Sequence, residues 1–138
     1  MARFDKSLVA VTSRSFSTNQ FLVKKLKESY PNVSLNLTGK TLKENELVKF
    51  LATADKAIVG IEIIDKDILD QLPKLKLISK YGVGLNNLDL DECKKRNIQI
   101  KFQPGSNKQS VAEFTLLLML NSLRQVHNNK TEIIEGNW

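Results

Sequence analysis

The chain has 138 residues, 41% hydrophobic and 26% charged, with a formal net charge of +6. This composition is that of an ordinary soluble globular protein, and the single cysteine, Cys93, excludes an internal disulfide. The longest apolar run, Leu116 to Leu120, is too short to cross a bilayer, and the N-terminus lacks the apolar core of a secretory signal. We therefore expect a cytoplasmic protein that does not act at a membrane.

The excess positive charge is scattered along the chain, with small groups at residues 24–27, 74–76 and 94–96. No aromatic residues are interleaved with these groups, so a solvated face is expected and nucleic-acid binding is not. With one cysteine and one histidine, the sequence also predicts no metal site. Cys93 is expected to be a buried or half-buried residue on a helix.

The first sixty residues alternate between short apolar runs typical of buried parallel strands and segments with apolar residues at helical spacing. Thr18 is the predicted N-cap of the first helix, which Pro31 closes. We predict strands over 8–13, 33–37 and 56–60, the second near a sheet edge, and helices over 18–28 and from Thr41 or Lys43 to Leu51.

The alternation continues beyond residue 60. A helix capped by Asp65 stops before Pro73, and it is followed by a strand over 75–79, a helix over 89–96 and a strand over 98–102. Five strands alternating with helices predict an α/β fold, a flavodoxin-like five-stranded parallel sheet with helices on both faces. In such sheets ligands bind outside the carboxyl ends of the strands.

The segment from Lys80 to Asp89 contains Gly82 and Gly84 and joins the fourth strand to a helix. Such a turn can present backbone N–H groups at a helix N-terminus, which favours a carboxylate or a phosphate. A tight turn without any ligand is the alternative. A dinucleotide fingerprint is not predicted, because its third glycine is replaced by Asn87 and no acidic residue lies at 100–103.

The character of the chain changes after Pro104. Residues 104–107 form a linker with turn chemistry, and Ser110 is the predicted cap of a helix from Val111 to Leu123. This helix is apolar on nearly every side, so another domain or another subunit must cover it, and we predict a homodimer through it. His127 is expected at the surface of the polar segment that follows.

Four motifs in the order 75–90, 104–107, 110–115 and 135–138 resemble the N-terminal part of the D-2-hydroxyacid dehydrogenases, the family that includes D-3-phosphoglycerate dehydrogenase. The resemblance implies a substrate-binding domain over 1–104. Residues 105–138 would be a hinge and an interdomain helix leading to an NAD-binding Rossmann domain, whose fingerprint begins after the position of Trp138.

The implied function is hydride transfer between NAD and a D-2-hydroxy or 2-oxo acid. The family's catalytic arginine, glutamate and histidine match no residue here, so we predict no catalytic residue in this chain and no activity of the chain alone. The main NAD site is likewise not expected among these residues.

The resemblance also implies a substrate site built on backbone amides, since those of Val83 and Gly84 would hold the substrate carboxylate. Asn107 would approach both substrate and nicotinamide, and Val111 would pack near the nicotinamide ring. The predicted substrate-binding residues are Lys80, Tyr81, Gly82, Val83, Gly84 and Asn107, and the cofactor-binding residues are Asn107 and Val111.

Two departures from the family pattern affect the substrate. Residues 60–63 bring no arginine and add Glu62, so a phosphorylated substrate is less expected. Asn86 stands where Asp is common, which removes one carboxylate from the turn.

Two other functions remain open at this point. The chain could be a free-standing small-carboxylate-binding or dimerisation module without catalysis. A phospho-receiver domain shares the fold, but the acidic pair that it needs after the first strand is replaced by residues 12–15, Thr-Ser-Arg-Ser.

Overall fold

The structure is a computed structural model that describes residues 5–137. Its internal contacts divide the chain into two units, residues 1–104 and residues 105–138, which are described separately below. Trp138, the last residue of the C-terminal motif, lies outside the described residues.

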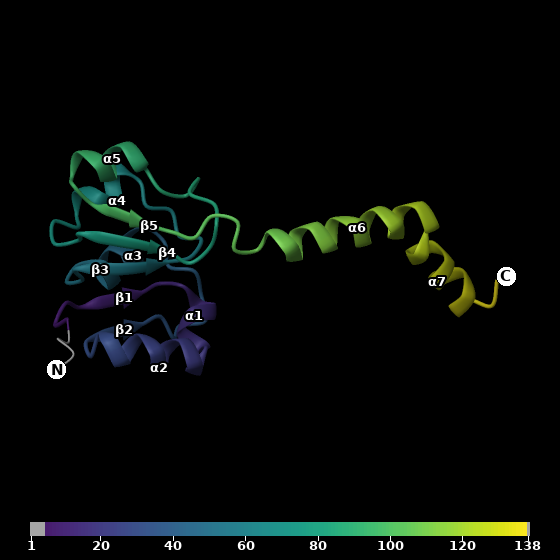
Figure 1. Cartoon of the computed structure of the whole chain (residues 1–138), viewed down its shortest axis with the longest axis horizontal. Helices are drawn as coiled ribbons and strands as arrows, with labels where there is room; N and C mark the ends of the chain where they lie inside the picture. The colour runs from purple at the N-terminus through teal and green to yellow at the C-terminus, as the bar shows by residue number, and fades with distance from the viewer. Residues whose placement is uncertain (1–4, 138) are drawn as a thin grey trace. The chain divides into compact units, whose positions relative to one another are not determined.

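The first unit is built on a parallel sheet of five strands in the order β2-β1-β3-β4-β5 (Figure 1). This order confirms the predicted flavodoxin-like sheet, and β2 is an edge strand as expected. The strands are β1 (Val9–Val11), β2 (Val33–Leu35), β3 (Lys56–Val59), β4 (Leu77–Lys80) and β5 (Gln99–Lys101).

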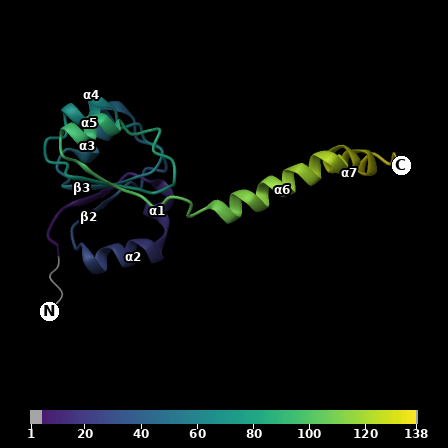
Figure 2. The same ribbon diagram turned by 45° about the horizontal axis from the view of Figure 1, so that its top comes forward.

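Five helices accompany the sheet. Figure 2 shows α2 on one face and α3, α4 and α5 on the opposite face, as the predicted fold requires. The helices are α1 (Arg14–Thr18), α2 (Gln20–Ser29), α3 (Glu44–Leu51), α4 (Lys66–Asp70) and α5 (Leu90–Lys95).

The core lies between the sheet and the helices of the second face. Ala10, Val59 and Ile78 contribute completely buried strand side chains, and Leu47 and Leu69 contribute buried side chains from α3 and α4. Burying one such leucine stabilises the fold by about 1.5–3 kcal/mol.

The prediction of a single helix over 18–28 was wrong in its start. The Ser13 hydroxyl accepts a hydrogen bond from the Phe16 N–H, so a short helix, α1, begins directly after β1. The chain is extended at Asn19, whose side chain caps α2 by accepting from the Leu22 N–H at 3.1 Å. Thr18 therefore ends α1 and is not the cap of α2.

The other helix boundaries in this unit follow the sequence signals. Asp65 accepts from the Ile68 N–H at 3.0 Å, which confirms the predicted cap. Asp89 caps α5 by accepting from the Glu92 N–H at 2.9 Å. Lys43 is the N-cap residue of α3 without a side-chain capping bond. Cys93 is buried in α5 as predicted, and burial raises the pKa of its thiol.

The second unit contains two helices, α6 (Lys108–Arg124) and α7 (Val126–Ile134). Asn107 is the N-cap residue of α6 and makes no side-chain capping bond, so the predicted cap at Ser110 was wrong: that residue lies inside the first turn. The segment predicted as a polar tail is helical, and His127 is an exposed residue near the start of α7. Between the two helices Gln125 adopts a left-handed conformation.

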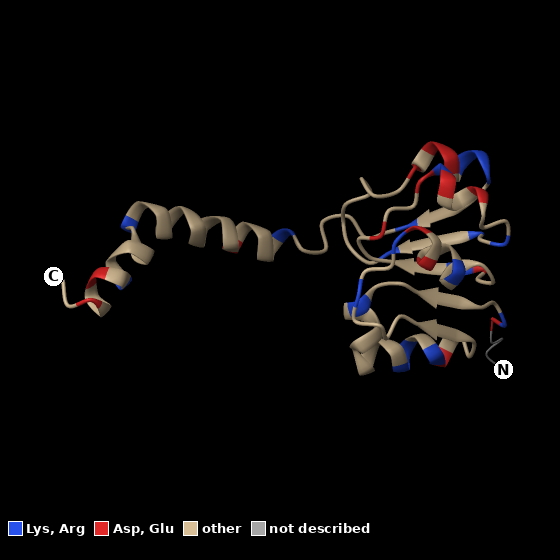
Figure 3. Cartoon of the chain, turned by 180° about the vertical axis from the view of Figure 1, so that it is seen from behind, with Lys and Arg blue, Asp and Glu red and all other residues tan. Residues whose placement is uncertain are grey.

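Charged residues are rare on α6, where Figure 3 shows basic residues at the two ends and one acidic residue between them. Its large apolar side chains are all at least 50% exposed within this unit: Val111, Phe114, Leu116, Leu117, Leu118, Met119, Leu120 and Leu123. In the part of the chain that the structure describes, no helix has both the length and the apolar character needed to cross a membrane.

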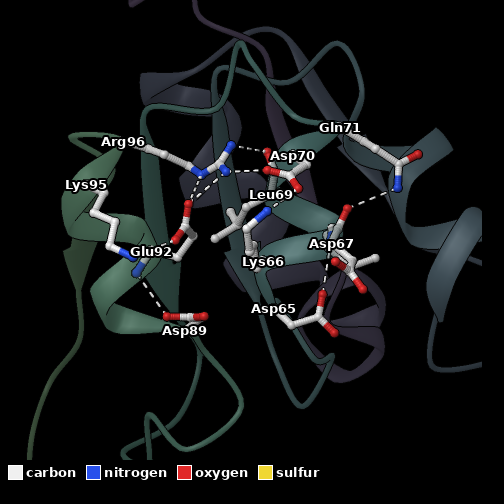
Figure 4. A network of polar contacts seen from close by, with 11 residues as sticks. Asp65, Lys66, Asp67, Leu69, Asp70, Gln71, Asp89, Glu92, Lys95 and Arg96 are labelled. Atoms are coloured by element: carbon white, nitrogen blue, oxygen red, sulfur yellow. Dashed lines mark hydrogen bonds and ion pairs between the residues drawn. The ribbon is translucent and has the colours of Figure 1, made fainter.

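An ion-pair network joins α4 to α5 on the outside of the sheet (Figure 4). The Arg96 guanidinium donates to the Leu69 carbonyl at 3.0 Å, to Glu92 Oε1 at 2.8 Å and to an Asp70 oxygen. The pKa of Asp70 is lowered mainly by its hydrogen bond with Lys66 and next by that with Arg96. The pKa of Glu92 is lowered mainly by its hydrogen bond with Arg96 and next by that with Lys95.

This network makes the stability of the folded protein depend on pH. Because the pKa values of Asp70 and Glu92 are lower in the folded protein, the network stabilises it above the unfolded values of about 4 and is lost as the pH falls through the folded values. Arg96→Met should lower the urea midpoint at pH 7, and its deficit relative to wild type should shrink at pH 3. The control is Lys94→Met, an exposed α5 residue outside the network. An Arg96→Met deficit of equal size at both pH values would contradict this assignment.

Candidate functional site

The candidate site lies at the carboxyl edge of the sheet, where the chain leaves β1, β3 and β4. The order of strands reverses at β1, which has β2 on one side and β3 on the other, so this edge contains the topological switch point. A cavity of about 450 Å³ opens there, lined by Ser13, Arg14, Ser15, Thr18, Gly39, Gly60, Ile61, Glu62 and Tyr81.

A buried carboxylate organises the segments that follow β1 and β3. Glu62 is 2% exposed, and its Oε2 accepts hydrogen bonds from Thr12 Oγ1 at 2.8 Å and from the Gly60 N–H at 2.9 Å. A Cβ on Gly60 would lie 3.2 Å from Ser13 Cβ, so glycine permits the two segments to approach this closely. The carboxylate thus fixes one wall of the cavity.

The glycine turn, residues 81–88, leaves β4 with a hydrogen bond from the Tyr81 N–H to the Val59 carbonyl at 2.8 Å. Gly82 has φ +145°, a conformation that favours glycine. Within residues 5–137, the N–H groups of Gly82, Val83 and Gly84 donate no hydrogen bond. Three consecutive backbone donors are therefore available to an anion.

The far end of the turn returns to the segment after β3. The Ile64 N–H donates to the Asn87 carbonyl and the Asp89 N–H donates to the Ile64 carbonyl, each at 2.9 Å, which forms a parallel bridge between Ile64 and Leu88. The turn is thus held at both ends by the neighbouring strand and its extension.

The predicted placement of the glycines at a helix N-terminus was wrong. Helix α5 begins at Leu90, beyond the turn, and the Asp89 carboxylate already caps it, with Asp91 and Glu92 in its first turn. These acidic residues occupy the positive end of the helix dipole and would repel another anion. An anion at the glycines would rely on the turn's own N–H groups.

Lys80 is half-buried below the turn. Its ammonium group donates to the Gly60 carbonyl and, at 2.7 Å, to Asn87 Oδ1. Burial lowers the pKa of Lys80, and the nearby Glu62 carboxylate acts in the opposite direction. Its donors are therefore directed at protein acceptors in this structure.

Tyr81 is 42% exposed and packs edge-to-face on Phe16, with ring centroids 5.3 Å apart, so it joins α1 to the cavity wall. Asn107 and Val111 belong to the second unit, where they are exposed at the start of α6.

Of the predicted residues 80–84, the structure brings Lys80 and Tyr81 next to residues that sequence reasoning had not assigned to the site, whereas Gly82, Val83 and Gly84 are not among the residues that line the cavity. Ser13 and Arg14 follow β1, and Gly60 and Glu62 follow β3. Their positions at or just after the ends of two predicted strands were a usable signal, because the carboxyl ends of parallel strands meet at one edge.

The chain matches the sequence profile of the family described as D-isomer specific 2-hydroxyacid dehydrogenase, catalytic domain, over residues 9–135. It is 31% identical over 105 residues to a hydroxypyruvate reductase of Thermotoga maritima, covering 75% of this chain and 34% of that protein. It is 33% identical over 95 residues to D-3-phosphoglycerate dehydrogenase of Mycobacterium tuberculosis, covering 68% of this chain and 18% of that protein.

Solved structures agree with this relationship. D-lactate dehydrogenase from Aquifex aeolicus, complexed with NAD and lactic acid, is 25% identical with a TM-score of 0.73, over 95% of this chain and 38% of that chain. The chain thus belongs to the D-2-hydroxyacid dehydrogenase family, and it spans 34% of the hydroxypyruvate reductase that it matches.

The two glycines of the turn should respond differently to substitution. Gly82→Ala should lower the free energy of unfolding by about 1–3 kcal/mol, because φ +145° is strained for alanine. In Gly84→Ala the new Cβ meets only the flexible end of Asn86 at 3.2 Å, so the change should stay within about 0.5 kcal/mol. Urea unfolding of both variants measures the difference, and equal losses would refute it.

Proposed function

We propose that the chain is the substrate-binding part of an NAD-dependent oxidoreductase that transfers a hydride between NAD and a D-2-hydroxy or 2-oxo acid. The observation that carries the proposal is the row of unpaired N–H groups at Gly82, Val83 and Gly84, at the carboxyl edge of a sheet in a chain of this family. Such a row suits a carboxylate, the group that all these acids share. Tyr81 would border the bound acid, and Lys80 would add positive charge below it.

The charges around the cavity favour an acid without a phosphate. Glu62 lines the cavity as a buried carboxylate and would repel a second anionic group. Arg14 also lines the cavity, but its side chain is exposed and donates to the Gly39 carbonyl at 3.3 Å. An exposed arginine is screened by water, so the buried carboxylate has the stronger effect.

NAD would be held mainly by residues other than these. The turn at Gly82 does not fit a pyrophosphate, because no free helix N-terminus follows it and Asp89 fills the one that lies beyond. Asn107 and Val111 would contact the nicotinamide from the start of α6. When bound, the nicotinamide would accept a hydride from the 2-hydroxy acid as NAD⁺ or give one to the 2-oxo acid as NADH, while the residues of this chain would hold and orient the acid.

A second domain would cover the apolar groups at the carboxyl edge. Exposed apolar side chains follow four of the strands there: Leu37, Ile61, Ile63, Tyr81 and Phe102. Single exposed apolar residues are common, but a set gathered at one edge marks an interface. We infer that residues 1–104 form the substrate domain and that residues 105–138 lead to the NAD-binding domain.

The alternative is a free-standing small-carboxylate-binding module without catalysis. The donors of the glycine turn all lie within the first unit, so carboxylate binding would not need the second. The intact mass of the native protein in its source cells separates the two functions: a mass more than twice 15.6 kDa supports the dehydrogenase, and a mass near 15.6 kDa supports the module.

Carboxylate binding is tested by titrating the ¹⁵N-labelled chain with pyruvate and following the amide signals. Signals of residues 82–84 should shift in a saturable way, and 3-phosphoglycerate should bind more weakly than D-glycerate, which has the same carbon skeleton. Lactamide, which lacks the carboxylate charge, is the control. The chain alone should not oxidise NADH with pyruvate. Shifts absent from residues 82–84, or equal for lactamide and D-lactate, would refute the site.

Self-association through α6 is a separate expectation. We propose a homodimer that covers the apolar residues from Val111 to Leu123. Leu117→Glu should weaken association at least tenfold in sedimentation equilibrium, since burying a leucine contributes about 1.5–3 kcal/mol. Thr131→Glu, an exposed position on α7, is the matched control. A monomeric wild-type chain with α6 helical would contradict the dimer.

A further inference from the structure

Two side chains join the two ends of the glycine turn directly. Lys80 is the last residue of β4 before the turn, and Asn87 lies near the end of the turn. The Lys80 ammonium donates to Asn87 Oδ1 at 2.7 Å across the base of the turn. This contact closes the turn into a loop whose ends cannot separate without breaking a charge-assisted hydrogen bond.

The same two residues attach the turn to the segment after β3. Asn87 Nδ2 donates to the Glu62 carbonyl at 2.6 Å and to the Gly60 carbonyl at 3.3 Å, and the Lys80 ammonium donates to the Gly60 carbonyl as well. The Asn87 carbonyl accepts from the Ile64 N–H at 2.9 Å. Asn87 therefore bonds to three residues of the segment from Gly60 to Ile64.

That segment is a rigid support. The buried Glu62 side chain bonds to the Gly60 N–H at 2.9 Å and to Thr12 at the end of β1 at 2.8 Å. Losing these two bonds would leave the buried carboxylate without donors, which is costly. The attachment point of the turn is thus tied to two central strands, β1 and β3.

The middle of the turn has no such attachment. The N–H groups of Gly82, Val83 and Gly84 bond to nothing within residues 5–137, so their direction is imposed from the two ends. Fixing one residue's backbone costs about 1–2 kcal/mol of conformational entropy. Contacts that impose this order before a ligand arrives increase its affinity.

We propose that Lys80 and Asn87 are positioning residues that preorganise the glycine turn for its anion, and that Lys80 acts through Gly60 and Asn87 without contacting the ligand. The proposal rests on the proposed function, which supplies the anion. The positioning role itself depends only on the contacts between the turn and the segment from Gly60 to Ile64.

The test is Asn87→Ala in the full chain, because this substitution changes no charge and leaves Lys80 in place. With pyruvate as the probe, the dissociation constant should rise at least tenfold, and hydrogen exchange of amides 82–86 should become faster. Asn45→Ala, an exposed residue of α3, should change neither quantity. If the Lys80 ammonium bound the anion directly, releasing it from Asn87 would leave the affinity for pyruvate unchanged or higher. That result would overturn the proposal.

A second variant separates positioning from general destabilisation. Ile78→Val trims a completely buried side chain of β4 and should lower the melting temperature without changing the pyruvate affinity. An equal loss of affinity in Ile78→Val would overturn the proposal. If the wild-type chain binds no pyruvate, the proposed function fails, but hydrogen exchange still tests the positioning role of Asn87. Unchanged exchange in Asn87→Ala overturns that role. Faster exchange limited to amides 82–86 supports it.

Discussion

Parallel pairing of β3 with β4 is the constraint on which the rest of the site depends. The ladder runs from Lys56 opposite Leu77 to Val59 opposite Lys80, and it resumes as the bridge between Ile64 and Leu88. Between these two paired stretches, the segment after β3 and the segment after β4 must both leave the sheet at the same edge. The glycine turn and the Gly60–Glu62 segment are the two excursions, and their proximity follows from the pairing.

A buried carboxylate beside the proposed anion site needs a physical reason, because taking a charge out of water is costly. Glu62 is compensated by hydrogen bonds from the Gly60 N–H and the Thr12 hydroxyl. Burial lowers the pKa of the half-buried Lys80, and the Glu62 carboxylate acts in the opposite direction. The positive charge of Lys80 faces carbonyl and amide oxygens, so the carboxylate and the ammonium are each hydrogen-bonded to neutral groups. This arrangement supports the backbone of two loops, and within residues 5–137 the N–H groups of Gly82, Val83 and Gly84 remain without an acceptor.

The two units differ in how far they bury their apolar residues. In the first, the sheet and helices bury a continuous core, and five of the exposed apolar side chains, Leu37, Ile61, Ile63, Tyr81 and Phe102, follow strand ends. In the second, α6 and α7 bury no residue, although α6 carries eight large apolar side chains. A helix with this composition gains most of its stability from what packs against it. The proposed interdomain and dimer contacts would supply that packing.

The sequence by itself determined the alternation of strands and helices, the edge position of β2, and the cap at Asp65, because these follow from local spacing and from side chains that bond within a few residues. It also contained the motifs that resemble the family, and the comparisons confirm the family itself. The sequence-based prediction misplaced the start of α2, because Asn19 competes with Thr18 as the capping residue, and it also misplaced the start of α6. It took α7 for a polar tail, because that segment lacks a strong apolar period. Only the tertiary structure showed that Lys80, Asn87 and Glu62 share one network. Contacts between residues 80 and 60 or 62 and 12 depend on strand order and register, which no local signal encodes.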